Sequence, residues 1–301
     1  ILFLAHHSKD KFVFRSISES LHNIFSDKSP VTFNKDTGSV GTLLNGLPKL
    51  KFEGGNPADH RTQRNESRDE FDDGEDGLLA AEEQSDELSL IAKMITLFKT
   101  IEILGQVLKN QYSTIERVDK SDLLVELFNG PLRAIRDFYD FCERHPDALI
   151  IDVKAILTRK GKIDASDEEK TEIARRVAAS IVQMITYGFI SKTAQSVNSE
   201  NLRDEVEQVV KRVNTPAFRL IELATLLDSP KGVPKSKLTS LFSTLKNDLI
   251  GSRLIQFMAL NRLYMFKTSE ADMQWISQEL GIDLATQHQI TYQDKKQRLV
   301  K

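Results

Sequence analysis

The chain has 301 residues, with 41 Lys or Arg, 44 Asp or Glu, and one cysteine, Cys142. A lone cysteine cannot form an internal disulfide or a Cys-rich zinc site, which excludes stapled secreted domains and zinc fingers. Because no apolar stretch approaches the roughly 20 residues that cross a bilayer, we expect a cytoplasmic protein without a membrane partner. The first residue is Ile1, already inside an apolar run, so we expect the chain to begin within a strand of a larger protein.

Residues 1–65 are predicted to form a small α/β domain. Ile1–Ala5 is wholly apolar and suits a buried strand, and Ser8 can cap a helix that ends before Pro30. Apolar residues recur in that helix every three or four positions from Phe12 to Phe25. Leu47–Glu53 alternates apolar and polar side chains like a second strand. Strand, helix and strand in this order predict a βαβ unit.

An acidic segment follows at residues 66–87. It holds eleven Asp or Glu and one base, Arg68, so its net charge is −10, and the rest of the chain carries +7. Such a segment has too little apolar surface to offset the entropy of folding. We therefore predict a flexible linker between two domains.

Residues 88–301 are predicted to form an α-helical domain, so the fold class is α+β with a helical bundle or an irregular array of helices. Ser121 or Asp119 is expected to cap one helix, which stops at His145–Pro146. The acidic run Asp164–Glu169 is a strong helix start, because carboxylates favour the N-terminal end of the dipole. Helices are expected at 88–111, 121–144, 147 onward, 164–193, 201–213, 215–227, 235–247, 252–266 and 269–280.

Two segments partly match ligand-binding motifs. Gly161–Lys162–Ile163 lacks the upstream glycine and the hydroxyl of a phosphate-binding loop, so the segment is not expected to bind ATP. Asp72, Asp76 and Glu83 occupy the first, fifth and twelfth positions of a calcium loop, but Gly74 stands at the third. We interpret this stretch as part of the acidic linker, and expect no metal and no cofactor in these residues.

Histidines and one arginine near the start of the chain are weak candidates for catalysis. His6 and His7 follow the first predicted strand, but adjacent strand residues face opposite sides, so they are not expected to share a metal ion. Arg15 and His22 lie seven residues apart on one helical face, a spacing similar to that of helical ribonucleases. Because Ser16 follows the arginine and the helix belongs to the α/β unit, a ribonuclease is the weaker alternative.

Cys142 is three residues from His145, the nearest candidate base. Aromatic neighbours make a buried structural thiol the better interpretation, so no catalytic residue is assigned. The basic clusters are interpreted as solvated faces, although the last of them, beside Tyr292, could touch a phosphate backbone; they are Arg159–Lys162, Arg175–Arg176 and Lys295–Arg298.

Several segments together resemble the C-terminal part of bacterial STAND NTPases, which are similar to NACHT proteins. The resemblance spans nearly the whole chain and rests on packing residues at Leu2–Asp10, Phe98–Tyr112, Leu263–Thr268 and Leu280–Asp283. Gln63–Arg68 and a turn at Gly130–Arg133 also fit, whereas Pro131 and the acidic insertion depart from the pattern.

The resemblance implies a role in regulation. STAND proteins couple ligand recognition to ATP-driven oligomerisation, often in antiviral defence. This chain would be a non-catalytic segment that senses or relays the signal, with the ATPase core and its ATP and Mg upstream of Ile1. Its partners would be that core, further copies on activation, and a protein or nucleic-acid ligand. A stand-alone helical adaptor is the main alternative, and it requires an exposed apolar groove.

Overall fold

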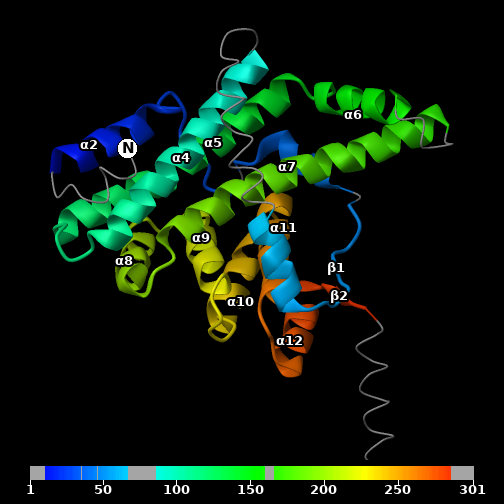
Figure 1. Cartoon of the computed structure of the whole chain (residues 1–301). Coiled ribbons are helices and arrows are strands. Elements are labelled where there is room, and N and C mark those ends of the chain that lie inside the picture. Colours follow the sequence, from blue (N-terminus) through cyan, green and yellow to red (C-terminus); the bar gives the residue numbers. More distant parts are fainter. Residues whose placement is uncertain (1–10, 35, 46, 67–85, 160–165, 286–301) are drawn as a thin grey trace, which may run out of the picture.

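The computed structural model of the chain describes residues 11–34, 36–45, 47–66, 86–159 and 166–285. These residues are mostly helical, which confirms the prediction of a mainly helical protein. Figure 1 shows three long helices that cross the molecule, α4, α5 and α7, with shorter helices on either side of them. The bounds of the three are Asp86–Asn110, Arg117–Arg144 and Asp167–Val197.

The three long helices pack against one another and supply much of the core. In α4 the fully buried residues recur at steps of three and four, which places them on one face: Leu97, Ile101, Leu104 and Leu108. The predicted start of α7 is confirmed, because Ser166 and Glu169 form a reciprocal capping box. The predicted caps of α5 are wrong, since that helix already begins at Arg117, after Glu116.

Helix α2 (Lys11–Asn23) packs on α4 and α5. Leu21 is fully buried at this contact, and a Cβ placed on Gly130 of α5 would lie 2.9 Å from its Cδ1 atom. Gly130 therefore lets α2 come close to α5. The turn expected at Gly130–Arg133 is wrong, because these residues and Pro131 lie inside the continuous helix α5.

Residues 24–50, which we name the connector, run through the helical body, and within them Gly38–Leu44 form the 3₁₀ helix η1. The connector touches α5 where the amide of Val31 donates to the Leu132 oxygen at 3.1 Å. Phe33 is buried although its φ is 57°, a backbone conformation that bulky residues rarely adopt. Its burial holds the connector in one path, because solvent exposure of this ring would be unfavourable.

The connector leads into a short strand, β1 (Lys51–Phe52), which lies within the predicted strand Leu47–Glu53. β1 pairs in parallel with β2 (Asp283–Leu284), from the opposite end of the described chain. A separate βαβ unit is thus not present among the described residues, and β1 uses a distant partner. The predicted strand Ile1–Ala5 lies outside them and stays a prediction.

Shorter helices complete the body, and in Figure 1 α8 to α12 lie below the long helices, with α6 above α7. The helices expected at 215–227 and 269–280 match α9 and α12, which Thr215 and Ser269 cap. The bounds are α6 Ala148–Arg159, η2 Glu200–Leu202, α8 Arg203–Val213, α9 Pro216–Leu227, α10 Lys235–Leu245, α11 Leu249–Met265 and α12 Glu270–Leu280.

The segments on either side of the acidic stretch share one hydrophobic core in the described residues, with Phe14, Phe33 and Phe52 in the same cluster as the helices. Residues 57–66 are helical and anchor beside α11, where Arg61 Nη1 donates to the Met265 oxygen at 2.6 Å. The acidic stretch itself lies almost wholly outside the described residues, so its flexibility stays a prediction. In the described part of the chain, no helix combines the length and the apolar character that crossing a membrane requires.

Candidate functional site

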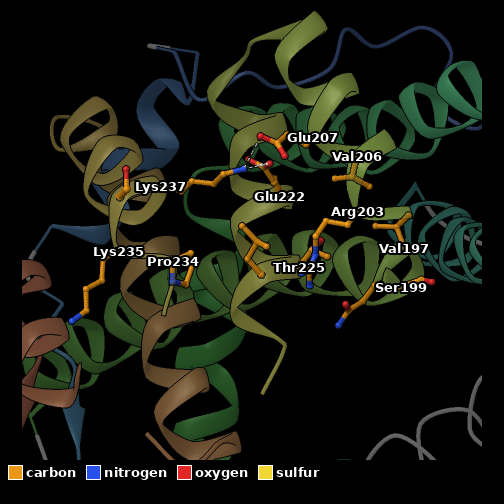
Figure 2. Close-up of a pocket in the computed structure, with 13 residues that line it drawn as sticks. Val197, Ser199, Arg203, Val206, Glu207, Glu222, Thr225, Pro234, Lys235 and Lys237 are labelled. Atoms are coloured by element: carbon orange, nitrogen blue, oxygen red, sulfur yellow. Dashed lines mark hydrogen bonds and ion pairs between the residues drawn. The ribbon is translucent and has the colours of Figure 1, made fainter. Parts of the chain in front are cut away.

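The candidate site is a groove on the surface of three consecutive helices, with α9 between α8 and α10. It consists of two adjoining hollows of about 410 Å³ and about 270 Å³, which share Glu207, Glu222, Ser236 and Lys237. Figure 2 shows the larger hollow, with side chains from the three helices around it. Since α8 and α10 each pack on α9, the groove follows α9 along its exposed side.

The base of the larger hollow is apolar. Val197 and Val206 are buried below its surface, and Leu226 and Pro234 line it while remaining partly exposed. Such a surface can accept apolar side chains, because contact removes apolar area from water on both sides.

An ion cluster separates the two hollows. Lys237 Nζ of α10 lies 2.5 Å from Glu222 Oε1 of α9 and 3.7 Å from Glu207 Oε1 of α8. Figure 2 shows these contacts as dashed lines at the head of the hollow. A hydrogen bond from Lys211, with the charge of Lys237, holds the pKa of Glu207 below its usual range. The cluster therefore ties three helices together.

Arg219 lies in the smaller hollow and is the cation with the least compensation there. Its Nη2 donates to Ser240 Oγ at 2.9 Å, but no carboxylate of the described residues lies within 4 Å of its guanidinium. The two hollows are lined by five basic residues and two acidic ones: Arg203, Lys211, Arg219, Lys235 and Lys237 against Glu207 and Glu222. Four of these bases already pair with carboxylates, two of them with Glu200 and Asp272 just outside the lining, so among the described residues Arg219 is the uncompensated charge of the groove.

The floor of the groove is joined directly to the connector. Helix α9 begins at Pro216, and the amide of Ala217 in its first turn donates to the carbonyl of Thr32 at 3.1 Å. First-turn amides have no partner within their own helix, so this carbonyl acts as part of the cap. A displacement of α9 would thus move Thr32 or break its hydrogen bond with Ala217.

The candidate ribonuclease pair lies elsewhere. Arg15 and His22 line a cavity of about 690 Å³ between α2 and α5, so the structure does bring them together beside a second helix. His22 Nδ1 lies 3.3 Å from Glu126 Oε1. Four carboxylates line the same cavity, those of Glu19, Asp119, Asp122 and Glu126. This surplus of negative charge repels a phosphodiester.

Cys142 and His145 do not form a catalytic pair. The thiol is buried, and burial raises its pKa to about 11, so it is protonated at neutral pH. His145 ends α5 and stacks on Phe141, with 5.1 Å between ring centroids. The interpretation of Cys142 as a buried thiol agrees with this geometry.

Other sequence candidates are partly outside the described residues. His6, His7, Gly161–Ile163, the calcium-like stretch 72–83 and the basic cluster Lys295–Arg298 all lie there. Arg175 and Arg176 are exposed on α7, as expected for a solvated face. Within the described ranges, no three His, Cys, Asp or Glu side chains are grouped closely enough to hold a metal ion.

The groove was not predicted from the sequence. Its one local signal was Glu222, a carboxylate within the mostly apolar run Leu220–Leu227. A charge at such a position indicates a partner in space, because an unpaired buried carboxylate is very unfavourable. A comparison of the chain with protein-family models finds no match, and comparisons with curated proteins and with solved structures find none either.

Proposed function

We propose that this chain is the non-catalytic regulatory segment of a STAND-type signalling NTPase, and that it relays ligand binding at the groove to an upstream ATPase core. The hydrogen bond between Ala217 and Thr32 carries this proposal, because it joins the floor of the groove to the connector. The connector follows the N-terminal helix α2 in the chain, and the proposed core would precede that helix.

The relay has a physical path from groove to connector. A ligand that binds between α8 and α10 favours one position of α9 over another, and the contact of α9 with the connector changes with that position. The connector contacts α5 and α11 as well, where Asp36 binds Arg136 and Thr37 Oγ1 lies 3.0 Å from Asp248 Oδ2. The connector also packs against α7, so it touches four helices, and a shift of α9 reaches it at Thr32.

The rest of the proposal follows the resemblance of the sequence to STAND proteins. ATP and Mg would bind in the upstream core, activation would assemble further copies, and the setting would be the cytoplasm, in bacterial antiviral defence. The chain itself would contribute recognition and transmission, without a reaction of its own.

Reading the coding frame upstream of Ile1 tests the proposal. We expect a strand followed by Gly-x-x-x-x-Gly-Lys-Ser/Thr and then an acidic strand, the two elements that bind Mg-ATP. In the whole protein, Arg136→Ala should uncouple ligand binding from nucleotide-dependent assembly, measured by sedimentation velocity, and leave ligand affinity unchanged. A frame without these motifs overturns the relay.

A stand-alone adaptor is the second candidate, and the groove favours it as well. An adaptor needs an exposed apolar surface framed by polar residues, and the larger hollow meets that description. The relay requires ATPase motifs in the upstream frame and a connector that responds to ligand binding, and a stand-alone adaptor requires neither. The ribonuclease alternative is disfavoured by the four carboxylates around Arg15 and His22.

A further inference from the structure

The groove has the dimensions of a short helix. The part of α9 that lines it runs from Arg219 to Leu226, which corresponds to about 12 Å or two helical turns. Its walls are helices whose backbone groups bond within each helix, so a peptide cannot add to them as a strand. An amphipathic helix laid along α9 would place its side chains in both hollows.

The charges of the groove select an acidic occupant. Four of the five basic residues that line the two hollows already pair with carboxylates, whereas Arg219 has only hydroxyl partners in the described structure. A guanidinium binds a carboxylate through two parallel hydrogen bonds, which are stronger than bonds to a hydroxyl. An incoming Asp or Glu would therefore replace Ser240 as the partner of Arg219 and form a stronger interaction.

The acids at the centre of the groove disfavour nucleic acid. Glu207 keeps 40% of its side-chain surface exposed, beside Glu222 and Lys237. A phosphate chain along the groove would pass these carboxylates, whereas a helix with spaced acids can turn apolar side chains toward them.

From these observations we propose that the groove binds an acidic amphipathic helix of a partner protein. The apolar side chains of that helix fill the larger hollow over Val206 and Leu226, and one of its carboxylates pairs with Arg219. This inference rests on the proposed function and deepens it, since it names the class of ligand that the relay would sense.

A peptide selection on the full 301-residue chain tests the inference. A random library of 16-residue peptides is displayed and selected for binding, and the strongest sequence is synthesised with a fluorophore for anisotropy. We expect selected peptides with net negative charge and apolar residues at spacings of three and four. A selection that yields no binder, or that yields basic peptides, overturns the proposal.

Two variants examine the two halves of the groove. Arg219→Glu reverses the charge in the smaller hollow, and Thr225→Trp fills the larger one; each is expected to weaken the peptide at least about tenfold. Arg175→Glu is the matched control, because Arg175 is exposed on α7, away from the groove, and should leave affinity unchanged. Circular dichroism and thermal unfolding verify that each variant is folded. Equal binding by R219E and wild type refutes the assignment.

Other occupants give different results. If the chain dimerises in sedimentation velocity and R219E abolishes the dimer, the groove belongs to a second copy. If a labelled 16-nucleotide single-stranded RNA binds and displaces the peptide, the groove belongs to nucleic acid. Either result overturns the proposal. Because these measurements need no ATPase core, their failure is distinguishable from failure of the relay, which the upstream frame decides.

Discussion

Arg136 of α5 holds Asp36 of the connector through two hydrogen bonds. Nη2 lies 2.7 Å from Asp36 Oδ2, and Nη1 lies 2.7 Å from the backbone oxygen of the same residue. The carboxylate also accepts from the amide of Thr32 at 2.7 Å. Since Thr32 in turn caps α9, this pair fixes the point at which the connector meets the groove.

Arg136→Ala is expected to lower the free energy of unfolding by about 2–3 kcal/mol, because the Asp36 carboxylate loses a charged partner in a partly buried site. Side-chain exposure is 20% for Arg136 and 24% for Asp36. Urea denaturation measures the change. The control is Arg176→Ala, whose pair with Glu172 is more than half exposed on α7 and should contribute less than about 0.5 kcal/mol. Equal effects of the two substitutions would contradict this view of Arg136.

Two helical glycines are expected to respond in opposite ways to alanine. A Cβ on Gly105 would lie 2.4 Å from the Ser196 oxygen, so Gly105→Ala should push α4 and α7 apart and lower stability by about 1–3 kcal/mol. A Cβ on Gly188 meets no described atom within 4 Å, so Gly188→Ala should raise stability by about 0.5–1 kcal/mol through helix propensity. Thermal and urea unfolding of both variants measure the difference. A stabilising Gly105→Ala would show that α4 and α7 are not packed closely at this point.

Cys142 should react only when the protein unfolds. Burial raises the pKa of its thiol to about 11, so at pH 8 about one thiol in a thousand is ionised even where reagent could enter. We expect no reaction with a chromogenic disulfide reagent in the native state, and one equivalent after addition of guanidinium. A rapid native reaction would place Cys142 at an accessible surface and reopen its pairing with His145.

Asp228 should make stability fall as the pH rises through the acid range. Burial raises the pKa of its carboxyl above the ordinary value of 3.8, although the Arg64 guanidinium, 3.2 Å away, opposes the shift. A raised native pKa means that this group contributes stability below about pH 3.8, which is lost as the pH rises through the native pKa. Asp228→Asn lacks this titration. We therefore expect the free energy of unfolding of the wild type, measured in urea, to fall relative to that of Asp228→Asn as the pH rises from 3.5 to 7. Movement in the opposite direction would mean that Arg64 prevails over burial.

Much of the secondary structure follows from local signals. The apolar spacing in 88–111 predicted α4 to within two residues, and the Ser166 and Glu169 capping box marked the start of α7. The ranges expected at 215–227 and 269–280 agree with α9 and α12, whose starts are capped by Thr215 and Ser269. The start of α5 was misjudged, because Ser121 and Asp119 offered equally good caps inside a helix that begins earlier.

The local patterns thus determine where helices begin and end, because caps and apolar periodicity act over a few residues. Tertiary structure alone decided that Lys51 pairs with Asp283. Backbone hydrogen bonds between strands do not depend on which side chains the strands carry, so the sequence does not identify a distant partner. It also decided the groove, which depends on α8, α9 and α10 meeting. Glu207, Glu222 and Lys237 become one cluster only when three helix faces converge, and long-range packing in the core sets that convergence.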